Sequence, residues 1–253
     1  MFRLFLLALL LTQTFALAAD KPPAAVRPVL RMGGFVVAPL MVGEPNEPIR
    51  GALPEFIMQE IAPKTNIDFV WLPPMTFLRA MQRIKEGSMD VVLLVSGPAA
   101  QTPNVARFKW TYLQTTPNLA VRVDSPLRQV ADLHALAGMN IGWVGGSRLP
   151  AEFKGIAVNW QLMFTPNWQA LNLRKLDLRR LDAAFYGNQY SPLYLARKEN
   201  LAIRLVPLPM PAQTFEMAYS FKTDKAALAQ FDAAATKAFA NDGFKLFLES
   251  YNN

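Results

Sequence analysis

The sequence predicts an α/β protein built as two lobes, and three observations predict it. Apolar strand patterns alternate with amphipathic helix patterns along most of the 253 residues, an order typical of parallel β-α-β units with right-handed crossovers. The alternation restarts after residues 119–123, which indicates a second unit. The chain is also long enough for two cores, since about 100 residues suffice for a lobe with a core of its own.

The first eighteen residues have the layout of a secretory signal peptide. Arg3 precedes an apolar run over residues 4–11, and Ala16-Leu-Ala18 offers a small-residue cleavage site. A retained membrane anchor is the alternative, but the apolar run is too short for a stable spanning helix. The sequence has no cysteine that could carry a lipoprotein anchor. We expect residues 1–18 to be removed and the rest of the chain to work in the periplasm.

Residues 29–95 predict the first lobe, because strand and helix patterns alternate there. Strands are expected at residues 29–35, 66–72 and 90–95. Helices with one apolar face are expected at residues 53–61 and 77–84. The run at residues 90–95 is apolar throughout, as in strands buried on both faces of a parallel sheet, and Gly87 ends the helix before it. The first lobe is therefore predicted as a mainly parallel sheet flanked by helices.

The second lobe begins where the strand at residues 119–123 carries the chain away from the first. Its strands are expected at residues 140–144, 157–162 and 183–186, and its helices at 132–138, 168–173, 176–181 and 190–198. Residues 145–148 form a glycine-rich turn that is expected to open a further helix. A strand at residues 215–221 returns the chain, and helices at 226–239 and 244–251 complete the first lobe. We expect residues 29–120 and 214–253 in lobe 1 and residues 121–213 in lobe 2.

Composition restricts the function classes. The formal net charge is +7, but the basic residues are dispersed, and the cluster around Arg174 and Arg179 lies among leucines at helical spacing without interleaved aromatic side chains. A solvated helix face explains this cluster better than a nucleic-acid surface. With no cysteine, thiol chemistry and disulfides are excluded. Past residue 18 no apolar run has the length of a membrane span, so we expect a soluble mature chain, monomeric and without membrane insertion.

Catalytic and metal-binding groups are scarce. The only histidine is His134, and no Gly-x-Ser-x-Gly nucleophile motif is present. Zinc ligands and the alternating acidic residues of a calcium loop are also missing from the sequence. We therefore expect no cofactor, no metal and no enzymatic activity.

Short motifs spread over nearly the whole mature chain resemble those of periplasmic solute-binding proteins of the polar amino-acid type, bacterial extracellular solute-binding protein family 3. They are Ala38-Pro-Leu-Met, Gly51, Phe77-Leu-Arg-Ala80, Glu86-Gly-Ser-Met-Asp90, Thr102-Pro103, Asp132-Leu133, Gly142-Trp-Val-Gly-Gly-Ser147, Leu181-Asp-Ala183, Asp242-Gly243 and Tyr251. The resemblance implies a type 2 periplasmic-binding fold, in which two α/β lobes joined by two hinge strands close on a ligand. It also implies delivery of that ligand to the permease of an ABC importer.

Two positions depart from the family pattern. Where amino-acid binders of the family have Thr-Pro-Glu-Arg, with an arginine for the α-carboxylate, this chain has Thr102-Pro-Asn-Val105. The family commonly places an acid for the α-ammonium five residues after the aspartate that corresponds to Asp182. In this chain that position is Gly187. Desolvating two charges without counter-charges costs several kcal/mol. A standard zwitterionic amino acid is therefore not the expected ligand.

The expected ligand site lies between the lobes. Its candidate residues are Phe77, Arg79, Ser96, Gly97, Gly146, Ser147, Arg148, Tyr186 and Asn188. Ser147 and Arg148 follow a glycine turn whose N–H groups favour an anion, although such a turn also occurs for tight geometry alone. Arg79 is a substitute for the missing arginine, or else it forms a surface or interlobe ion pair. Further candidate wall aromatics are Phe35, Trp71, Trp110, Tyr112 and Trp143.

The sequence thus predicts capture of a small organic solute, with anions among the candidates, for an ABC importer. Two alternatives stay open. A sensory protein of the same fold would signal to a membrane partner such as a kinase or cyclase, and a lyase or dehydratase would transform its ligand on the same scaffold. Fold alone does not decide among them.

Overall fold

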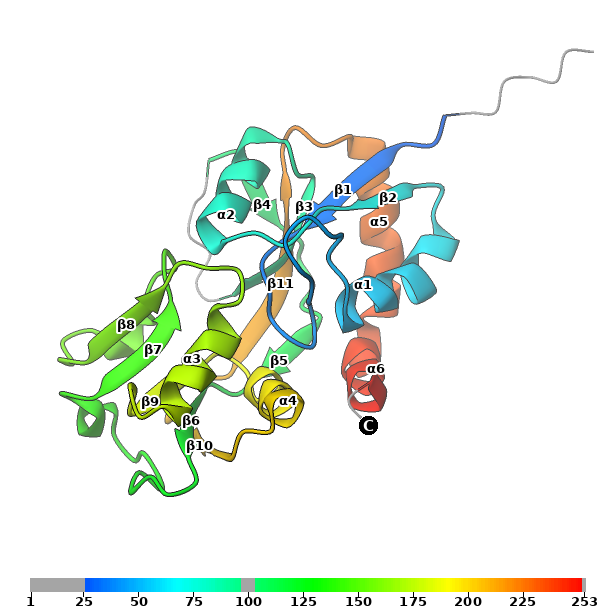
Figure 1. The fold of residues 1–253 in the computed structure, drawn as a ribbon. Coiled ribbons are helices and arrows are strands. Elements are labelled where there is room, and N and C mark those ends of the chain that lie inside the picture. The colour runs from blue at the N-terminus through cyan, green and yellow to red at the C-terminus, as the bar shows by residue number, and fades with distance from the viewer. Residues whose placement is uncertain (1–25, 97–102, 252–253) are drawn as a thin grey trace, which may run out of the picture.

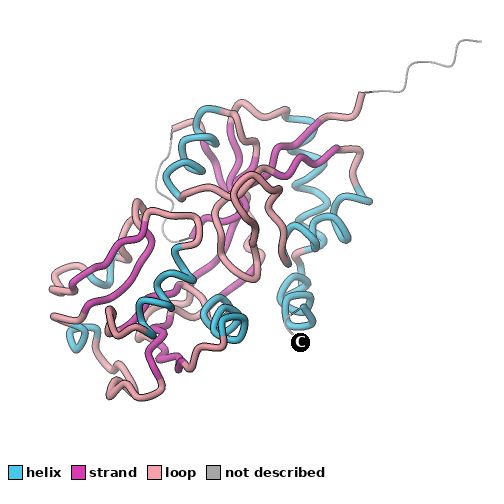
Figure 2. Tube along the Cα trace, in the orientation of Figure 1, coloured by secondary structure: helices cyan, strands magenta, loops and turns pink. Residues whose placement is uncertain are grey.

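A computed structural model describes residues 26–96 and 103–251. Within this part of the chain the strands form two sheets, one in each of two lobes (Figure 1). The tube in Figure 2 shows helices packed around the strands of both lobes. The first sheet has the order β2-β1-β3-β11-β4, with β5 also paired to β11, and the second has the order β10-β6-β9-β7-β8. The expected two-lobed α/β architecture, with helices flanking each sheet, is confirmed.

The first lobe combines a parallel and an antiparallel part. Its strands are β1 (Val29–Gly33), β2 (Asp68–Trp71), β3 (Val91–Ser96), β4 (Val105–Arg107), β5 (Leu113–Thr115) and β11 (Gln213–Ser220). Strands β2, β1 and β3 are parallel, whereas β11 runs antiparallel to β3, β4 and β5. Its helices are α1 (Ala52–Phe56), which continues as η1 (Ile57–Ile61) and η2 (Ala62–Lys64), α2 (Phe77–Glu86), α5 (Lys225–Ala238), η5 (Ala240–Asp242) and α6 (Gly243–Tyr251).

The second lobe repeats this mixture. Its strands are β6 (Asn118–Arg122), β7 (Asn140–Val144), β8 (Asn159–Met163), β9 (Ala183–Tyr186) and β10 (Ile203–Pro207). Strands β8, β7 and β9 are parallel, and β6 is antiparallel to β9 and β10. Its helices are η3 (Leu133–Leu136), η4 (Ala151–Phe153), α3 (Trp168–Asp177) and α4 (Tyr190–Glu199). Among the described residues, no helix is both long enough and apolar enough to span a bilayer.

Helix α2 illustrates how local sequence sets an element that borders the cleft. Thr76 caps its N-terminus, with the side-chain oxygen accepting from the Arg79 N–H at 3.3 Å. Ala80 and Ile84 are buried one turn apart, and Gly87 ends the helix with a left-handed backbone at φ 77°. The exposed face of α2 consequently carries Arg79.

Two expectations for the second lobe were wrong. The turn at residues 145–148 is followed by extended chain and the single 3-10 turn η4, so no long helix begins at Ser147. The helices expected at residues 168–173 and 176–181 are one helix, α3, which ends at Asp177. Arg179 adopts a left-handed backbone at φ 57°, which the right-handed helix cannot continue through. Strands β4, β5 and β10 were not expected from the sequence.

Two chain segments connect the sheets, between β5 and β6 and between β10 and β11. They run side by side, because Gln213 of β11 pairs with Thr115 of β5 and the Leu208 N–H donates to the Pro117 carbonyl at 3.1 Å. The buried Thr115 hydroxyl also donates to the Gly187 carbonyl at 2.7 Å. A double connection of this kind is typical of two-lobed proteins that close by a hinge.

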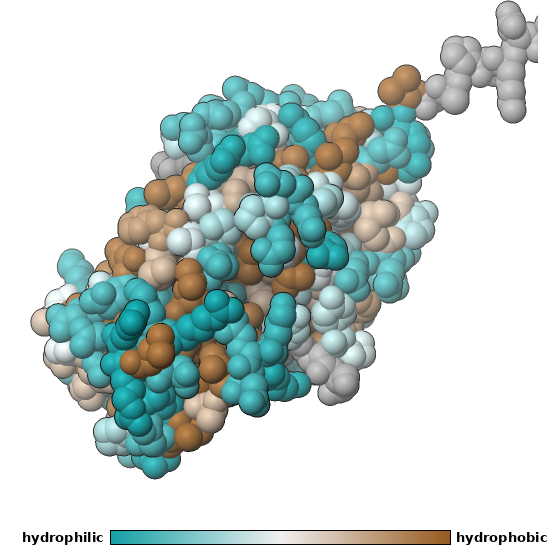
Figure 3. Space-filling view, in the orientation of Figure 1, coloured by the Kyte–Doolittle hydropathy of each residue, from teal (hydrophilic) through white to brown (hydrophobic). Residues whose placement is uncertain are grey.

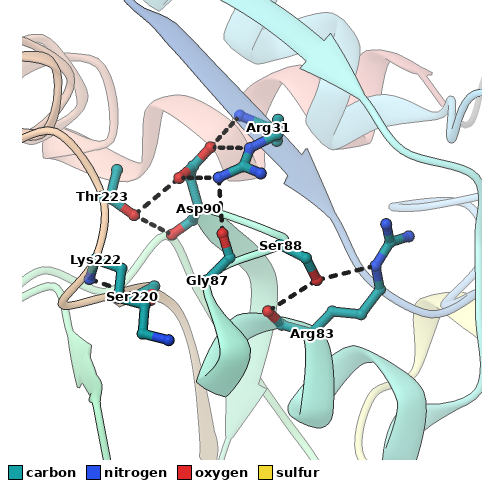
Figure 4. A network of polar contacts seen from close by, with 8 residues as sticks. All are labelled: Arg31, Arg83, Gly87, Ser88, Asp90, Ser220, Lys222 and Thr223. Atoms are coloured by element: carbon teal, nitrogen blue, oxygen red, sulfur yellow. Dashed lines mark hydrogen bonds and ion pairs between the residues drawn. The ribbon is translucent and has the colours of Figure 1, made fainter.

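A charged network ties β1 to β3 and to the end of β11 (Figure 4). The Asp90 carboxylate, whose side chain is 6% exposed, accepts from the Arg31 guanidinium at 2.8 and 3.0 Å and from the Arg31 N–H at 2.8 Å. Thr223 donates to the same carboxylate at 3.1 Å, and Arg31 also donates to the Gly87 carbonyl. Burial alone would raise the pKa of Asp90, but the Arg31 and Thr223 hydrogen bonds and the Arg31 charge outweigh it, so its pKa lies below the ordinary value.

This network makes stability depend on pH. A carboxyl whose pKa is lower in the folded protein stabilises it above the unfolded value, about 3.9 for aspartate, and loses this contribution as the pH falls through the folded pKa. We expect Asp90→Asn to lower the free energy of unfolding by about 1–3 kcal/mol at pH 7. In urea titrations the difference from wild type should shrink as the pH is lowered below about 3.9. A difference that stays constant over this range would contradict the assignment.

Candidate functional site

A cavity of about 70 Å³ lies between the two lobes. Both sheets and the helices next to them supply its walls. The apolar lining residues are Phe35, Val37, Phe77, Leu94, Trp143, Val144, Trp168 and Phe215, and the others are Ser96, Ser147, Gln169, Gly187, Asn188 and Gln213. This volume is well below the about 300–1,000 Å³ of pockets for drug-sized ligands. In this arrangement of the lobes, the cleft has room only for a small solute.

A direct hydrogen bond joins the lobes beside the cavity. The Gln169 side-chain oxygen, on the first turn of α3, accepts from the Ala38 N–H at 3.0 Å, and both residues are 1% exposed. The Gln169 backbone carbonyl accepts from the buried Tyr186 hydroxyl of β9 at 2.8 Å. Tyr186 thus fixes the start of α3, and Gln169 carries the contact to the first lobe.

A second contact between the lobes lies at the rim of the cleft. Gly146, at φ 88°, faces the Leu78 side chain of α2, because a Cβ atom added at Gly146 would lie 2.5 Å from the Leu78 Cγ. Gly145 faces the Phe164 ring of its own lobe, next to this contact. Leu78 and Phe164 are themselves 52% and 57% exposed. Figure 3 shows hydrophobic residues gathered on this side of the molecule near the boundary between the lobes.

Aromatic rings form much of the cavity wall. Phe35 and Phe77 meet edge to face with ring centroids 5.3 Å apart, and Trp143 and Trp168 do so at 5.4 Å. The first pair belongs to the first lobe and the second pair to the second lobe. Edge-to-face packing fixes ring orientation as well as burying apolar area. The two halves of the wall are therefore ordered within each lobe.

Gln213 occupies the space beside Gly187 that a side chain there would need. A Cβ atom added at Gly187 would lie 2.4 Å from the Gln213 side-chain oxygen. The family resemblance predicts an acid at position 187, and the neutral carboxamide of Gln213 in β11 lies there instead. Val105, in place of the expected arginine, lies in β4 opposite Ser220 and is not among the cavity residues.

The structure brings four of the predicted site residues to the cavity, namely Phe77, Ser96, Ser147 and Asn188. Arg79 lies on the exposed face of α2 and lines a separate open depression along that helix. Arg148 is exposed and is not a cavity residue. Gly146 and Tyr186 border the cavity residues without lining the cavity. Gly97 lies outside the described residues.

Of the candidate wall aromatics, Phe35 and Trp143 line the cavity, whereas Trp71, Trp110 and Tyr112 pack into the core of the first lobe. Sequence reasoning missed seven of the lining residues, namely Val37, Leu94, Val144, Trp168, Gln169, Gln213 and Phe215. Trp168 and Gln169 follow Thr165-Pro-Asn167, a helix start that could have marked them as candidates. Gln213 and Phe215 lie on the returning strand, and nothing in the local pattern distinguishes them.

Tyr186 is a support for the site. Burial, and secondarily the charge of Glu199, raise the pKa of its hydroxyl well above the ordinary value, so it stays protonated and donates to α3. We expect Tyr186→Phe to lower the free energy of unfolding by about 0.5–1.5 kcal/mol, measured by chemical denaturation. Ligand affinity should change less than about threefold. A larger loss of affinity without loss of stability would place the hydroxyl on the ligand.

His134 is not among the described residues that line the cavity. His134 bonds to Asp132 at 2.9 Å, and its side chain is 76% exposed. Within residues 26–96 and 103–251, no three His, Cys, Asp or Glu side chains gather in a way that could hold a metal ion. Uncharged polar groups and aromatic rings are what the cavity offers to a ligand.

No protein-family model and no curated protein matches the chain. Solved structures do match it. The periplasmic domain of BvgS from B. pertussis is similar at 16% identity and a TM-score of 0.72, over 89% of this chain and 43% of that one. The amino-acid ABC transporter substrate-binding protein AbpA from Streptococcus pneumoniae, bound to L-arginine, is similar at 18% identity and a TM-score of 0.68, over 88% and 94%.

The GluR0 ligand-binding core, in complex with L-glutamate, is similar at 11% identity and a TM-score of 0.72, over 91% of this chain and 100% of that one. This chain spans less than half of the BvgS periplasmic chain and nearly all of the other two. At these identities the similarity establishes architecture alone. The chain has the two-lobed fold of periplasmic binding proteins.

Proposed function

We propose that this protein captures a small organic solute in the cleft between its lobes, in the periplasm, for delivery to an ABC importer. One observation carries the proposal, namely a cavity whose walls come from both lobes, with Phe77 and Ser96 on one side and Ser147 and Asn188 on the other. A ligand that touches both walls binds the closed arrangement better than an open one and shifts the population toward it. We further propose that the protein acts as a monomer and leaves its ligand chemically unchanged.

The division into lobes that this function needs follows the two sheets to within three residues, since β6 of the second sheet begins at Asn118 and β11 of the first sheet begins at Gln213. We propose residues 29–120 with 214–253 as one moving body and residues 121–213 as the other, with the paired connections near Thr115 and Gln213 as the hinge. Closure then turns one body against the other without changing either core. The leader at residues 1–18 would direct export.

Signalling to a membrane partner is the second candidate function, and the similarity to the BvgS periplasmic domain supports it. The ligand chemistry would be the same in both cases, and only the partner differs. Sequencing the genes next to that of this chain separates the two. Permease and ATPase genes would support delivery, whereas a membrane kinase or cyclase gene would support sensing.

A thermal-shift screen tests the binding function itself. A ligand that binds only the native state stabilises it by about 2.7 kcal/mol at a concentration of one hundred times its Kd. We expect at least one class of small polar solute, from amines, organic acids, amides, amino acids and oligopeptides, to raise the midpoint of unfolding. Turnover of a bound solute by the purified protein, followed by mass spectrometry, would contradict the proposal in favour of a lyase.

A further inference from the structure

We propose, on the basis of the function proposed above, that the cleft selects a small uncharged solute whose carbonyl or amide oxygens accept hydrogen bonds. None of the described residues that line the cavity has an ionisable side chain. The polar groups of the lining are hydroxyls, carboxamides and indoles. The site therefore recognises its ligand through dipoles.

Two carboxamides of the lining have their oxygens already engaged. The Gln169 oxygen accepts from the Ala38 N–H at 3.0 Å, and the Asn188 oxygen accepts from the Ser191 N–H at 2.8 Å. A backbone N–H can only donate, so these contacts fix which end of each carboxamide is the oxygen. The NH₂ groups of Gln169 and Asn188 are then the ends that stay available. Both are neutral donors, and donors call for acceptor atoms on the ligand.

Two indoles of the cavity wall also have unpaired donors, but both Nε1 atoms are buried beneath the cavity surface. Trp143 and Trp168 line the cavity, and the Nε1 atom of each is buried without a hydrogen-bond partner among the described residues. An indole N–H can donate only, and a buried donor without a partner is costly. The Ser147 hydroxyl, by contrast, already donates to the Val144 carbonyl at 3.3 Å. The polar groups around this cavity that lack a hydrogen-bond partner are thus mostly neutral donors.

The Gln213 side chain leaves no room for an acidic side chain at position 187. Its carboxamide fills the space next to the Gly187 Cα, and a carboxylate side chain at position 187 would collide with it. A cationic ligand accordingly finds no counter-charge on this wall. The rings of Phe35, Phe77 and Phe215 supply apolar area but no formal charge.

An anion is the strongest rival, because donors and helix N-termini also attract negative charge. Helices α3 and α4 begin at Trp168 and Tyr190, next to lining residues. A helix N-terminus carries only about half an elementary charge, whereas an anion in an apolar cleft loses its full hydration. A neutral carbonyl oxygen can accept hydrogen bonds from the same donors without losing the hydration of an ion. The donors therefore favour a neutral acceptor over an anion.

Two triples of probes with fixed shape and different charge test the proposal. They are acetamide, acetate and acetamidinium, and benzamide, benzoate and benzamidinium, titrated at pH 7 by ligand-detected NMR. We expect the neutral amide to bind at least about tenfold more tightly than either ion of its triple. If a carboxylate or an amidinium binds most tightly, the inference is overturned while the proposed binding function stands. If no probe and no solute of the thermal-shift screen binds, the binding function itself fails, and the inference falls with it.

A charge variant locates the binding. Gln213→Glu keeps the side-chain shape and introduces a carboxylate into the lining, so the amidinium should gain at least about tenfold relative to the amide. Gln161→Glu makes the same change on the exposed side of β8 and should leave the preference unchanged. Circular dichroism and thermal unfolding check that both variants fold. Equal effects of the two variants, or no effect of Gln213→Glu, would place the probes outside the cleft and overturn the inference.

Discussion

Replacing Gln169 by alanine is expected to weaken ligand binding by about 5- to 150-fold. The Ala38 N–H would lose its only described partner while it stays buried in the closed cleft. A buried unsatisfied donor costs about 1–3 kcal/mol, which corresponds to that range of affinity. In the open form water can solvate the same N–H, so the cost falls on closure and not on the folding of either lobe. Isothermal titration with the best solute of the thermal-shift screen measures the effect.

The matched control is Gln161→Ala, which removes an exposed glutamine of β8 and should leave both affinity and stability unchanged. The Gln169→Ala protein itself should unfold within about 1 kcal/mol of wild type when no ligand is present. An unaltered affinity would show that the bond between Gln169 and Ala38 does not contribute to the binding-competent state.

Gly146→Ala is the second substitution with a large expected effect, a loss of affinity of about 5- to 20-fold. The added Cβ would lie 2.5 Å from the Leu78 Cγ across the cleft, so the closed lobes could meet only after Leu78 moves. Overpacking of this kind typically costs about 1–3 kcal/mol, and the exposure of Leu78 places the expected loss in the lower part of that range. The left-handed backbone at φ 88° adds a cost of about 1–2 kcal/mol to folding in any case.

Gly155→Ala separates these two costs. Gly155 also has a left-handed backbone, at φ 84°, but nothing lies within 4 Å of a Cβ added there. Both variants should lose similar stability in thermal unfolding, and only Gly146→Ala should lose affinity. Leu78→Ala combined with Gly146→Ala should recover most of the affinity, as a double-mutant cycle between contacting residues predicts. Equal affinity losses for Gly146→Ala and Gly155→Ala would rule out the rim contact as the cause.

The elements of the fold were predictable where a single period dominates the sequence. The apolar run of β3 and the one-sided apolar face of α2 each fix their structure locally. The short strands β4, β5 and β10 were not predictable in this way, because they are defined by their pairing with distant strands. The break of α3 after Asp177 depends on the left-handed backbone of Arg179. An arginine in the sequence does not indicate such a backbone conformation.

The cleft was predictable only in part, and for a physical reason. Ser96 ends a buried parallel strand, Ser147 follows another, and Asn188 lies between a strand and a helix. In α/β sheets such strand ends meet at the ligand crevice. Gln169 was not found, because its role depends on a contact with Ala38, 131 positions away in the chain. The exposed position of Arg79 could have been anticipated, since Ala80 and Ile84 define the buried face of α2.

The most direct test of the central claim measures the distance between the lobes as ligand is added. The chain has no cysteine, so Lys85→Cys in lobe 1 and Lys154→Cys in lobe 2, both exposed positions, accept a spin label each without interference. Double electron–electron resonance should show a broad distance distribution that becomes shorter and narrower when a solute that raises the unfolding midpoint is added. A distribution that stays the same at saturating solute would contradict capture by closure of the two lobes.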